Sequence, residues 1–135
     1  MRSVTLAKTF LLVNFKLFPN PIFVQHRKNN KTVYGEPIAA GLGTDGTQCW
    51  HKCWRHAAAF VMGPPLRPDP TVKEYLMDLL AIGDLSCVGT DNCTFNADQK
   101  AMGASDFTKI PNGVNGIEDR MAIVWEKGVV CILFL

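Results

Sequence analysis

The residues with the clearest capacity for chemistry lie in residues 83–96, where a short apolar run ends in a carboxylate. Residues 85–90 are predicted to form a buried strand, and Asp91 follows that strand directly. An acid at the carboxyl end of a strand is how α/β proteins place a catalytic or ligand-binding group at the edge of a sheet. The alternative is an Asx turn, in which Asp91 and Asn92 only close the strand. Taken alone, this segment favours the turn.

A second group of reactive side chains could supply tetrahedral zinc ligands. It consists of Cys49, His51, Cys53 and His56. No second pair of ligands follows at the spacing of a zinc finger. In a helix over residues 50–62, two of the cysteines and one histidine fall near one face, so packing explains the pattern as well. The sequence favours packing over a zinc site here.

Two predicted helices and one strand must position these groups. Residues 33–38 are predicted to form a short parallel strand that Pro37 ends. A helix is predicted to begin with a capping box formed by Thr71 and Glu74 and to end at Gly83. Its apolar residues recur at helical spacing and are Val72, Tyr75, Leu76, Leu79 and Leu80.

A final helix is predicted from Asn115, as the N-cap, to Gly128. Its predicted buried stripe contains Ile117, Met121, Val124 and Trp125. Between the two helices, the loop at residues 110–116 contains Asn112 followed by Gly113. Such a pair is typical of a tight turn.

Five blocks in a fixed order then identify a resemblance. They are VYGEPIAA from Val33, GTDGT from Gly43, MGPPLRPD from Met62, GTDNCTFN from Gly89 and FTKIPNGVNGIEDRM from Phe107. In this order the blocks resemble the dihydropyrimidinases, which are cyclic amidohydrolases of the hydantoinase group, over roughly residues 33–129. Several matching blocks in order form a stronger signal than any single motif.

The resemblance implies an α/β fold. Relatives of this kind are several times longer and form a metal-dependent (β/α)8 barrel with a small accessory β-domain. This chain could supply only the last two β/α units, and a barrel cannot close from so few strands because sheet edges would stay unpaired. We therefore expect a barrel fragment over residues 33–129, a non-family N-terminal extension over residues 1–32 and an apolar tail over residues 130–135.

The resemblance also implies the chemistry. Dihydropyrimidinases open the ring of dihydrouracil or dihydrothymine in pyrimidine catabolism, with two zinc ions held by four histidines, a carboxylated lysine and one aspartate. Asp91 matches that aspartate, which implies a metal ligand that is also the catalytic general acid and base. Asn112 matches the asparagine that contacts the substrate, and Gly63 lies where the backbone touches it. Without the resemblance, Asn112 would be interpreted as a turn residue.

The remaining zinc ligands lie upstream of Val33 in the family, and neither His51 nor His56 matches them. One carboxylate cannot hold two zinc ions, so we expect this chain alone to bind no catalytic zinc tightly and to hydrolyse nothing. The alternative identity is a fragment of a non-enzymatic adaptor like the collapsin response mediator proteins. Those proteins lose the metal aspartate and carry an acid in place of the asparagine before glycine, so Asp91 and Asn112 favour the enzyme.

Composition limits the remaining partners and the compartment. The chain has 135 residues, 19% of them charged, and a formal net charge of +2, which gives no sign of a nucleic-acid surface. The apolar run at residues 10–18 falls well short of the ~20 residues that cross a membrane. Five cysteines without a regular framework predict a reducing, cytoplasmic location. The expected partners are a small cyclic amide and, by resemblance, the other subunits of a homotetramer.

Overall fold

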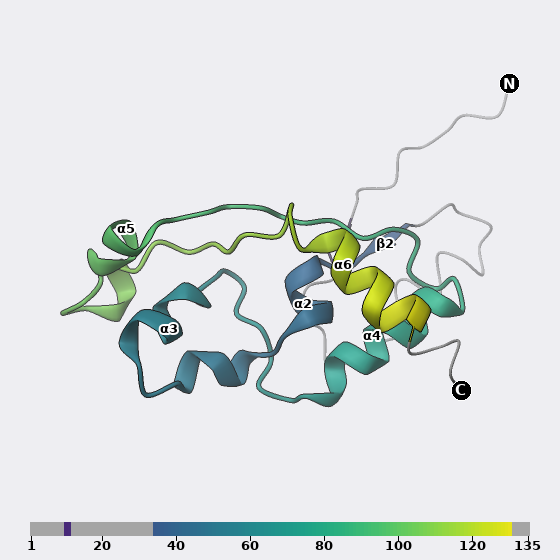
Figure 1. Cartoon of the computed structure of the whole chain (residues 1–135), viewed down its shortest axis with the longest axis horizontal. Helices are drawn as coiled ribbons and strands as arrows, with labels where there is room; N and C mark the ends of the chain where they lie inside the picture. Colours follow the sequence, from purple (N-terminus) through teal and green to yellow (C-terminus); the bar gives the residue numbers. More distant parts are fainter. Residues whose placement is uncertain (1–9, 12–33, 131–135) are drawn as a thin grey trace, which may run out of the picture.

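The computed structural model describes residues 10–11 and 34–130 and is elongated, with α5 at one end and α4 at the other (Figure 1). Most of the predicted extension over residues 1–32 and of the tail over residues 130–135 lies outside the described residues. The elements in chain order are β1 (Phe10–Leu11), β2 (Gly35–Glu36), α2 (Ala39–Gly43), the 3-10 helix η1 (Gly46–Trp50), α3 (Trp54–Ala59), α4 (Thr71–Ala81), α5 (Ala97–Ala101), the 3-10 helix η2 (Phe107–Lys109), α6 (Arg120–Val124) and the π-helical turn η3 (Trp125–Val130).

The strands are short and parallel. β1 pairs with β2, with Phe10 opposite Gly35. Ile38 then forms an isolated parallel bridge with Gly89, where the Ala39 amide donates to the Gly89 carbonyl over 2.9 Å and the Gly89 amide donates to the Pro37 carbonyl over 3.0 Å. The predicted strand over residues 33–38 is therefore confirmed only at β2 and this bridge.

The prediction of a continuous strand over residues 85–90 is wrong, because only Gly89 bridges. A strand depends on a backbone partner along its whole length, and the short β2 region and the Ile38 bridge pair with only part of this segment. The segment is instead held at Gly89, at Ser86, whose amide donates to the Gly35 carbonyl over 2.8 Å, and at Leu85, whose amide donates to the Leu79 carbonyl over 3.0 Å.

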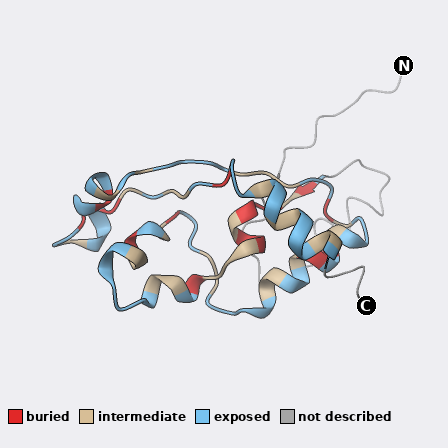
Figure 2. Cartoon of the chain, in the orientation of Figure 1, coloured by how far each residue is buried: buried red, intermediate tan, exposed pale blue. Residues whose placement is uncertain are grey.

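Most buried residues lie around α2 and between α2 and α4, and a smaller number lie at α3 and beside α5, as Figure 2 shows. α2 packs against both α4 and α6. Ile38 and Met62 form one buried cluster, joined by Leu66 and Val114. Leu79 and Leu85 form a second cluster with other leucines of α4. These two clusters hold the ends of the segments that carry the candidate site.

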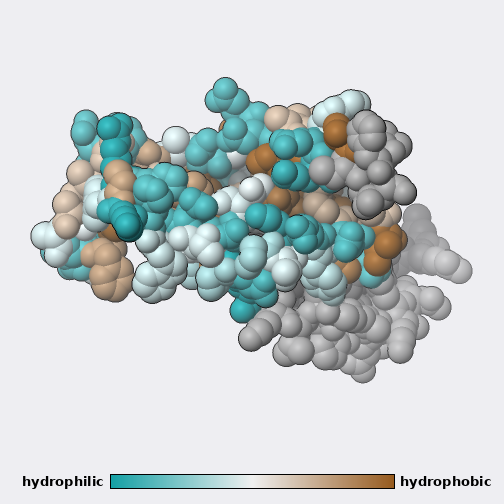
Figure 3. All heavy atoms as spheres, turned by 60° about the horizontal axis from the view of Figure 1, so that its bottom comes forward, coloured by the Kyte–Doolittle hydropathy of each residue, from teal (hydrophilic) through white to brown (hydrophobic). Residues whose placement is uncertain are grey.

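The predicted buried stripe of the last helix is wrong, because three of its four residues are exposed and Val124 is only half-buried. Ile117, Met121 and Trp125 are 68%, 70% and 64% exposed. α6 contacts α2 through a different residue, Ile123, so tightly that a Cβ atom on Gly43 would lie 2.8 Å from the Ile123 side chain. Helical spacing predicts a shared face but not which face finds a partner. Hydrophobic residues accordingly reach the surface of the described part at several places (Figure 3).

The start of the last helix also differs from the prediction. α6 begins at Arg120 after Asp119. Asn115, the predicted N-cap, instead donates its side-chain amide to the Asp119 carboxylate over 2.9 Å. The predicted helix over residues 50–62 is likewise shorter, with η1 and α3 in its place.

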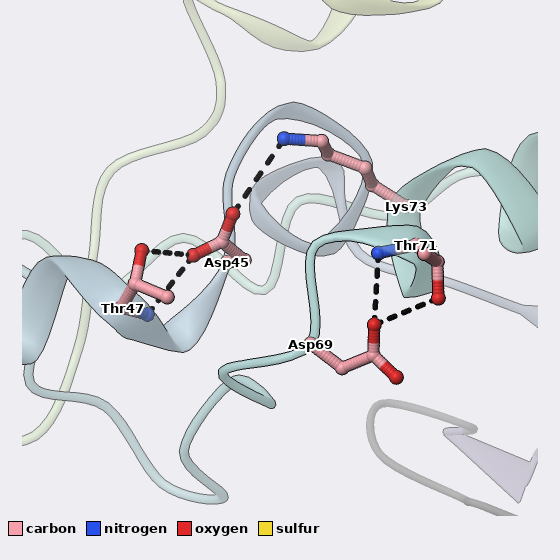
Figure 4. A network of polar contacts seen from close by, with 5 residues as sticks. All are labelled: Asp45, Thr47, Asp69, Thr71 and Lys73. Atoms are coloured by element: carbon pink, nitrogen blue, oxygen red, sulfur yellow. Dashed lines mark hydrogen bonds and ion pairs between the residues drawn. The ribbon is translucent and has the colours of Figure 1, made fainter.

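Two Asp–Thr pairs open η1 and α4 (Figure 4). Asp45 accepts hydrogen bonds from the amide and hydroxyl of Thr47, and Lys73 of α4 lies 3.5 Å from the Asp45 carboxylate. Asp69 accepts from the amide and hydroxyl of Thr71 over 3.0 and 2.7 Å. The predicted capping box with Thr71 as N-cap is therefore wrong, because Asp69 performs the capping from upstream.

The end of α4 agrees with the prediction. Gly83 has a φ of +79°, the left-handed conformation that stops a helix. Within the described residues, no helix has the length and hydropathy needed to cross a membrane.

Candidate functional site

Two extended segments, residues 88–96 and 110–116, run side by side between α5 and the α2–α6 region (Figure 1). The Cys93 amide donates to the Val114 carbonyl over 3.0 Å, and the Gly116 amide donates to the Asn92 side-chain carbonyl over 3.0 Å. The first segment carries Asp91 and the second carries Asn112, so the fold brings both parts of the predicted site onto one pair of segments.

Asp91 follows the Gly89 bridge closely and is exposed. Its φ is +45°, a conformation that aspartate tolerates better than most residues but that still has a free-energy cost. Among the residues that the structure describes, its carboxylate makes no hydrogen bond or ion pair. The neighbouring Asn92 side chain makes the local contacts instead, to Gly116 and to the Thr94 hydroxyl. Asp91 therefore does not close an Asx turn, and its carboxylate remains available to a ligand.

Asn112 and Gly63 lie together, although 49 positions separate them in the sequence. A Cβ atom on Gly63 would lie 3.9 Å from the Asn112 Cβ and Cγ atoms. The Gly113 amide donates to the Val61 carbonyl over 3.0 Å and so joins the two loops. The Asn112 side chain is exposed beside the backbone of Gly63. No hydrogen bond or ion pair in the described part of the chain joins Asp91 to either residue.

Gly113 permits the close approach of the two segments. Its φ is +154°, and a Cβ atom there would lie 2.3 Å from the Cys93 carbonyl oxygen. Any other residue would collide with the backbone that follows Asp91, so Gly113 fixes the spacing of the segments.

Lys100 is the residue at this site that the sequence did not reveal. It belongs to α5 and is only 4% exposed. Its ammonium group donates to the carbonyls of Val61, Pro111 and Gly113 over 2.9, 2.7 and 2.9 Å. Burial lowers its pKa from the ordinary value, an effect that Cys93 and Cys49 oppose. A lysine in a polar connection looks like a surface residue, and no sequence pattern marked this one as buried.

The cysteine and histidine group lies at η1 and α3. Burial raises the pKa of the Cys49 thiol, which donates to the Phe60 carbonyl over 3.7 Å. The rings of His51 and His56 stack with centroids 4.1 Å apart, and His56 Nε2 lies 2.8 Å from the Gln48 side-chain oxygen. The packing interpretation fits Cys49 and His56, which are half-buried, but not Cys53, which is exposed.

The donor set in the described chain does not fit a zinc pair. No three His, Cys, Asp or Glu side chains within residues 10–11 and 34–130 gather around one point. Asp91 is a single carboxylate with no second candidate ligand beside it. No reaction step can be derived through a metal from these residues alone.

Comparison with known proteins identifies the origin of this arrangement. The chain is 73% identical over 108 residues to a dihydropyrimidinase of Dictyostelium discoideum, a match that covers 80% of this chain and 22% of that one. It is 68% identical over 108 residues to the dihydropyrimidinase of Rattus norvegicus, covering 80% of this chain and 21% of that one. It is 47% identical over 104 residues to dihydropyrimidinase-related protein 5 of Homo sapiens, covering 77% of this chain and 18% of that one. No family model matches.

Solved structures give the same result. The dihydropyrimidinase of Brevibacillus agri superimposes with a TM-score of 0.74 at 39% identity, covering 81% of this chain and 23% of that one. A D-hydantoinase from Thermus sp. gives a TM-score of 0.72 at 34% identity, covering 80% and 23%. The fold is thus part of a hydantoinase-type cyclic amidohydrolase. Within that class the chain belongs to the dihydropyrimidinase family, and it spans about a fifth of the length of the curated relatives that it matches.

Proposed function

We propose that this chain is a segment of a dihydropyrimidinase that hydrolyses the ring amide of dihydrouracil or dihydrothymine, and that it supplies the last two β/α units of the catalytic barrel. The observation that carries the proposal is the 73% identity to the Dictyostelium discoideum dihydropyrimidinase. The exposed carboxylate of Asp91, which makes no hydrogen bond or ion pair within residues 34–130, lies on the segment paired with the Asn112 loop and supports it. In the whole enzyme we propose a homotetramer in the cytoplasm, and the free thiols of the described cysteines agree with that compartment.

Each site residue has a proposed part in the reaction. Asp91 carries a proton between the attacking water and the leaving nitrogen and is also a metal ligand. A cyclic amide presents a donor beside an acceptor, and the Asn112 amide group offers both in return. Gly63 leaves space beside Asn112 for the substrate to reach the backbone. The other ligands of a zinc pair, which the family implies, must come from outside the described residues.

The alternative is a segment of a non-enzymatic adaptor related to the dihydropyrimidinases. Identity to the human dihydropyrimidinase-related protein 5 is 47%, well below the 73% to the Dictyostelium enzyme. Asp91 and Asn112 are the two positions at which the adaptors are expected to differ, and both carry the enzyme residue here. The enzyme is therefore the better supported of the two.

A hybrid enzyme tests the proposal. The matching residues of the Dictyostelium dihydropyrimidinase are replaced by those of this chain, and dihydrouracil hydrolysis is followed by the loss of ultraviolet absorbance. We expect the hybrid to turn over. Asp91→Asn should lower kcat by about 100-fold or more, because proton transfer by a positioned group contributes at least that much. Asp78→Asn, at an exposed position of α4, is the matched control and should leave kcat unchanged. If the hybrid folds and Asp91→Asn leaves its kcat unchanged, the assignment of Asp91 as the group that transfers the proton is wrong.

The 135-residue chain by itself gives a second test. Because the described residues do not fit a zinc pair, we expect the purified chain to hold no stoichiometric zinc and to leave dihydrouracil intact. Metal analysis by mass spectrometry and the same absorbance assay measure both. Stoichiometric zinc together with turnover would show that the expectation is wrong.

A further inference from the structure

Lys100 is a buried cation whose partners are all neutral. Removing an ammonium group from water is costly, and proteins commonly compensate by pairing it with a carboxylate. Here the three N–H donors are taken by three backbone carbonyls, each within 2.9 Å. The ring of Phe95 adds a weaker cation–π contact, with its centroid 5.5 Å from the ammonium nitrogen. The arrangement is fully hydrogen-bonded and specific in geometry.

The three carbonyls belong to the two loops that carry the proposed substrate contacts. Pro111 and Gly113 stand on either side of Asn112, so Lys100 holds the carbonyl groups that flank that residue. Val61 lies two positions before Gly63. The Val61 carbonyl also accepts the Gly113 amide, which makes it a shared point of both loops.

The lysine is itself held firmly. α5 opens with a reciprocal capping box between Asn96 and Gln99. On its other side, Gly103 packs against Ile110 so closely that a Cβ atom would lie 2.2 Å from the Ile110 side chain. The backbone that carries Lys100 is thus fixed by the cap of α5 and by the packing of Gly103 on Ile110, at the start of the Asn112 loop.

We propose that Lys100 is a positioning residue for substrate recognition, which clamps the Gly63 and Asn112 loops against each other at the separation seen here. The role in substrate recognition rests on the proposed function. The structural contact between Lys100 and the two loops does not depend on it. Lys100 does not contact the substrate in this proposal. It acts by fixing the backbone on which Asn112 and Gly63 stand.

The clamp is tested on the 135-residue chain by amide hydrogen exchange. Lys100→Met keeps the length of the side chain and removes its charge and donors. We expect the Gly113 amide to exchange at least roughly tenfold faster in this variant, while the Leu79 amide in α4 keeps its rate, because the effect is local. Lys109→Met, at an exposed lysine of η2, should change neither amide. An equal rise at Gly113 and Leu79, or no rise at Gly113, would overturn the clamp.

The substrate role is tested in the hybrid enzyme. A residue that only orients a ground-state contact raises KM and leaves kcat nearly unchanged. We expect Lys100→Met to raise KM for dihydrouracil roughly tenfold, the factor that the loss of about one hydrogen bond gives. A residue needed only for folding would lower the active fraction at constant KM, and that result would refute the role. If the hybrid without substitutions has no turnover, the proposed function fails, and the exchange experiment still decides the clamp.

Discussion

Gly113→Ala adds one methyl group at the point where the two extended segments touch, and its cost can be worked out from the structure. The φ of +154° suits glycine alone and costs another residue on the order of 1–3 kcal/mol. The new Cβ atom would lie 2.3 Å from the Cys93 carbonyl oxygen and 2.8 Å from the Cys93 Cβ atom. The segments must separate, which breaks the hydrogen bond from the Cys93 amide to the Val114 carbonyl, worth about 1 kcal/mol. We expect a total loss of about 2–4 kcal/mol.

Gly83→Ala is the matched control for this change. Gly83 also has a positive φ, of +79°, but a Cβ atom there would meet nothing within 4 Å. Only the backbone conformation is penalised, by about 1–2 kcal/mol. The assay is urea unfolding of the 135-residue chain followed by circular dichroism, with the midpoints compared at a common slope. If Gly113→Ala costs no more than Gly83→Ala, the close approach of the segments is not as described and the reasoning about this site fails.

Three further predictions concern other contacts. Asp45→Ala should lower the free energy of unfolding by about 1 kcal/mol, because Asp45 caps η1. The Thr47 hydroxyl holds the pKa of the Asp45 carboxyl below its ordinary value of 3.8. The stabilisation by Asp45 is therefore complete above pH 3.8 and is lost as the pH falls through the lower pKa of the folded state. Urea unfolding at several values from about pH 5 to about pH 2 measures this loss. Asn96→Ala should cost about 1 kcal/mol by removing the cap of α5, measured by thermal unfolding. Glu36→Gln should speed alkylation of Cys87 by iodoacetamide about threefold near pH 8, because a hydrogen bond to Glu36 raises the pKa of that thiol.

Each of these three changes has a control in the same chain. Asp78→Asn, at an exposed position of α4, should leave the free energy of unfolding nearly unchanged, and a loss equal to that of Asp45→Ala would contradict the capping argument. Ser105→Ala, at an exposed position near α5, should leave the midpoint of thermal unfolding unchanged, whereas Asn96→Ala should lower it. Alkylation of the exposed Cys53 should be indifferent to Glu36→Gln, and a matching acceleration would point to general loosening of the fold.

Local signals allowed some elements to be predicted and not others. α4 begins at Thr71 and its chain turns at Gly83, as expected, because helical spacing and a left-handed glycine depend only on neighbouring residues. Even there the capping residue is Asp69 and not Thr71, because the Asp69 carboxylate accepts hydrogen bonds from the Thr71 amide and hydroxyl. Residues 85–90 form one bridge instead of a strand, because a strand requires a distant partner that no local pattern specifies.

The burial of side chains and the composition of the candidate site also depend on partners that are distant in the sequence. Ile117 and Trp125 have the spacing of a buried stripe but are exposed, because burial depends on the surface opposite. Asp91 and Asn112 could be selected as site residues from the resemblance to a family. The exposure of the Asp91 carboxylate and the approach of Gly63 to Asn112 could not be predicted from the sequence. Lys100 escaped prediction because its long side chain suits solvent as well as a buried pocket, and only the fold brings three carbonyls to it.

The bonds that close the candidate site have a consequence for the order of folding. Lys100 and Val61 are 39 positions apart, and Cys87 and Glu36 are 51 apart, so each contact requires a long loop to close. α4 needs only its own eleven residues and can form within microseconds. We therefore expect α4 to form before the paired segments and their lysine, because its contacts are local in sequence. A chain stopped at that stage would contain α4 but no recognisable substrate-binding surface.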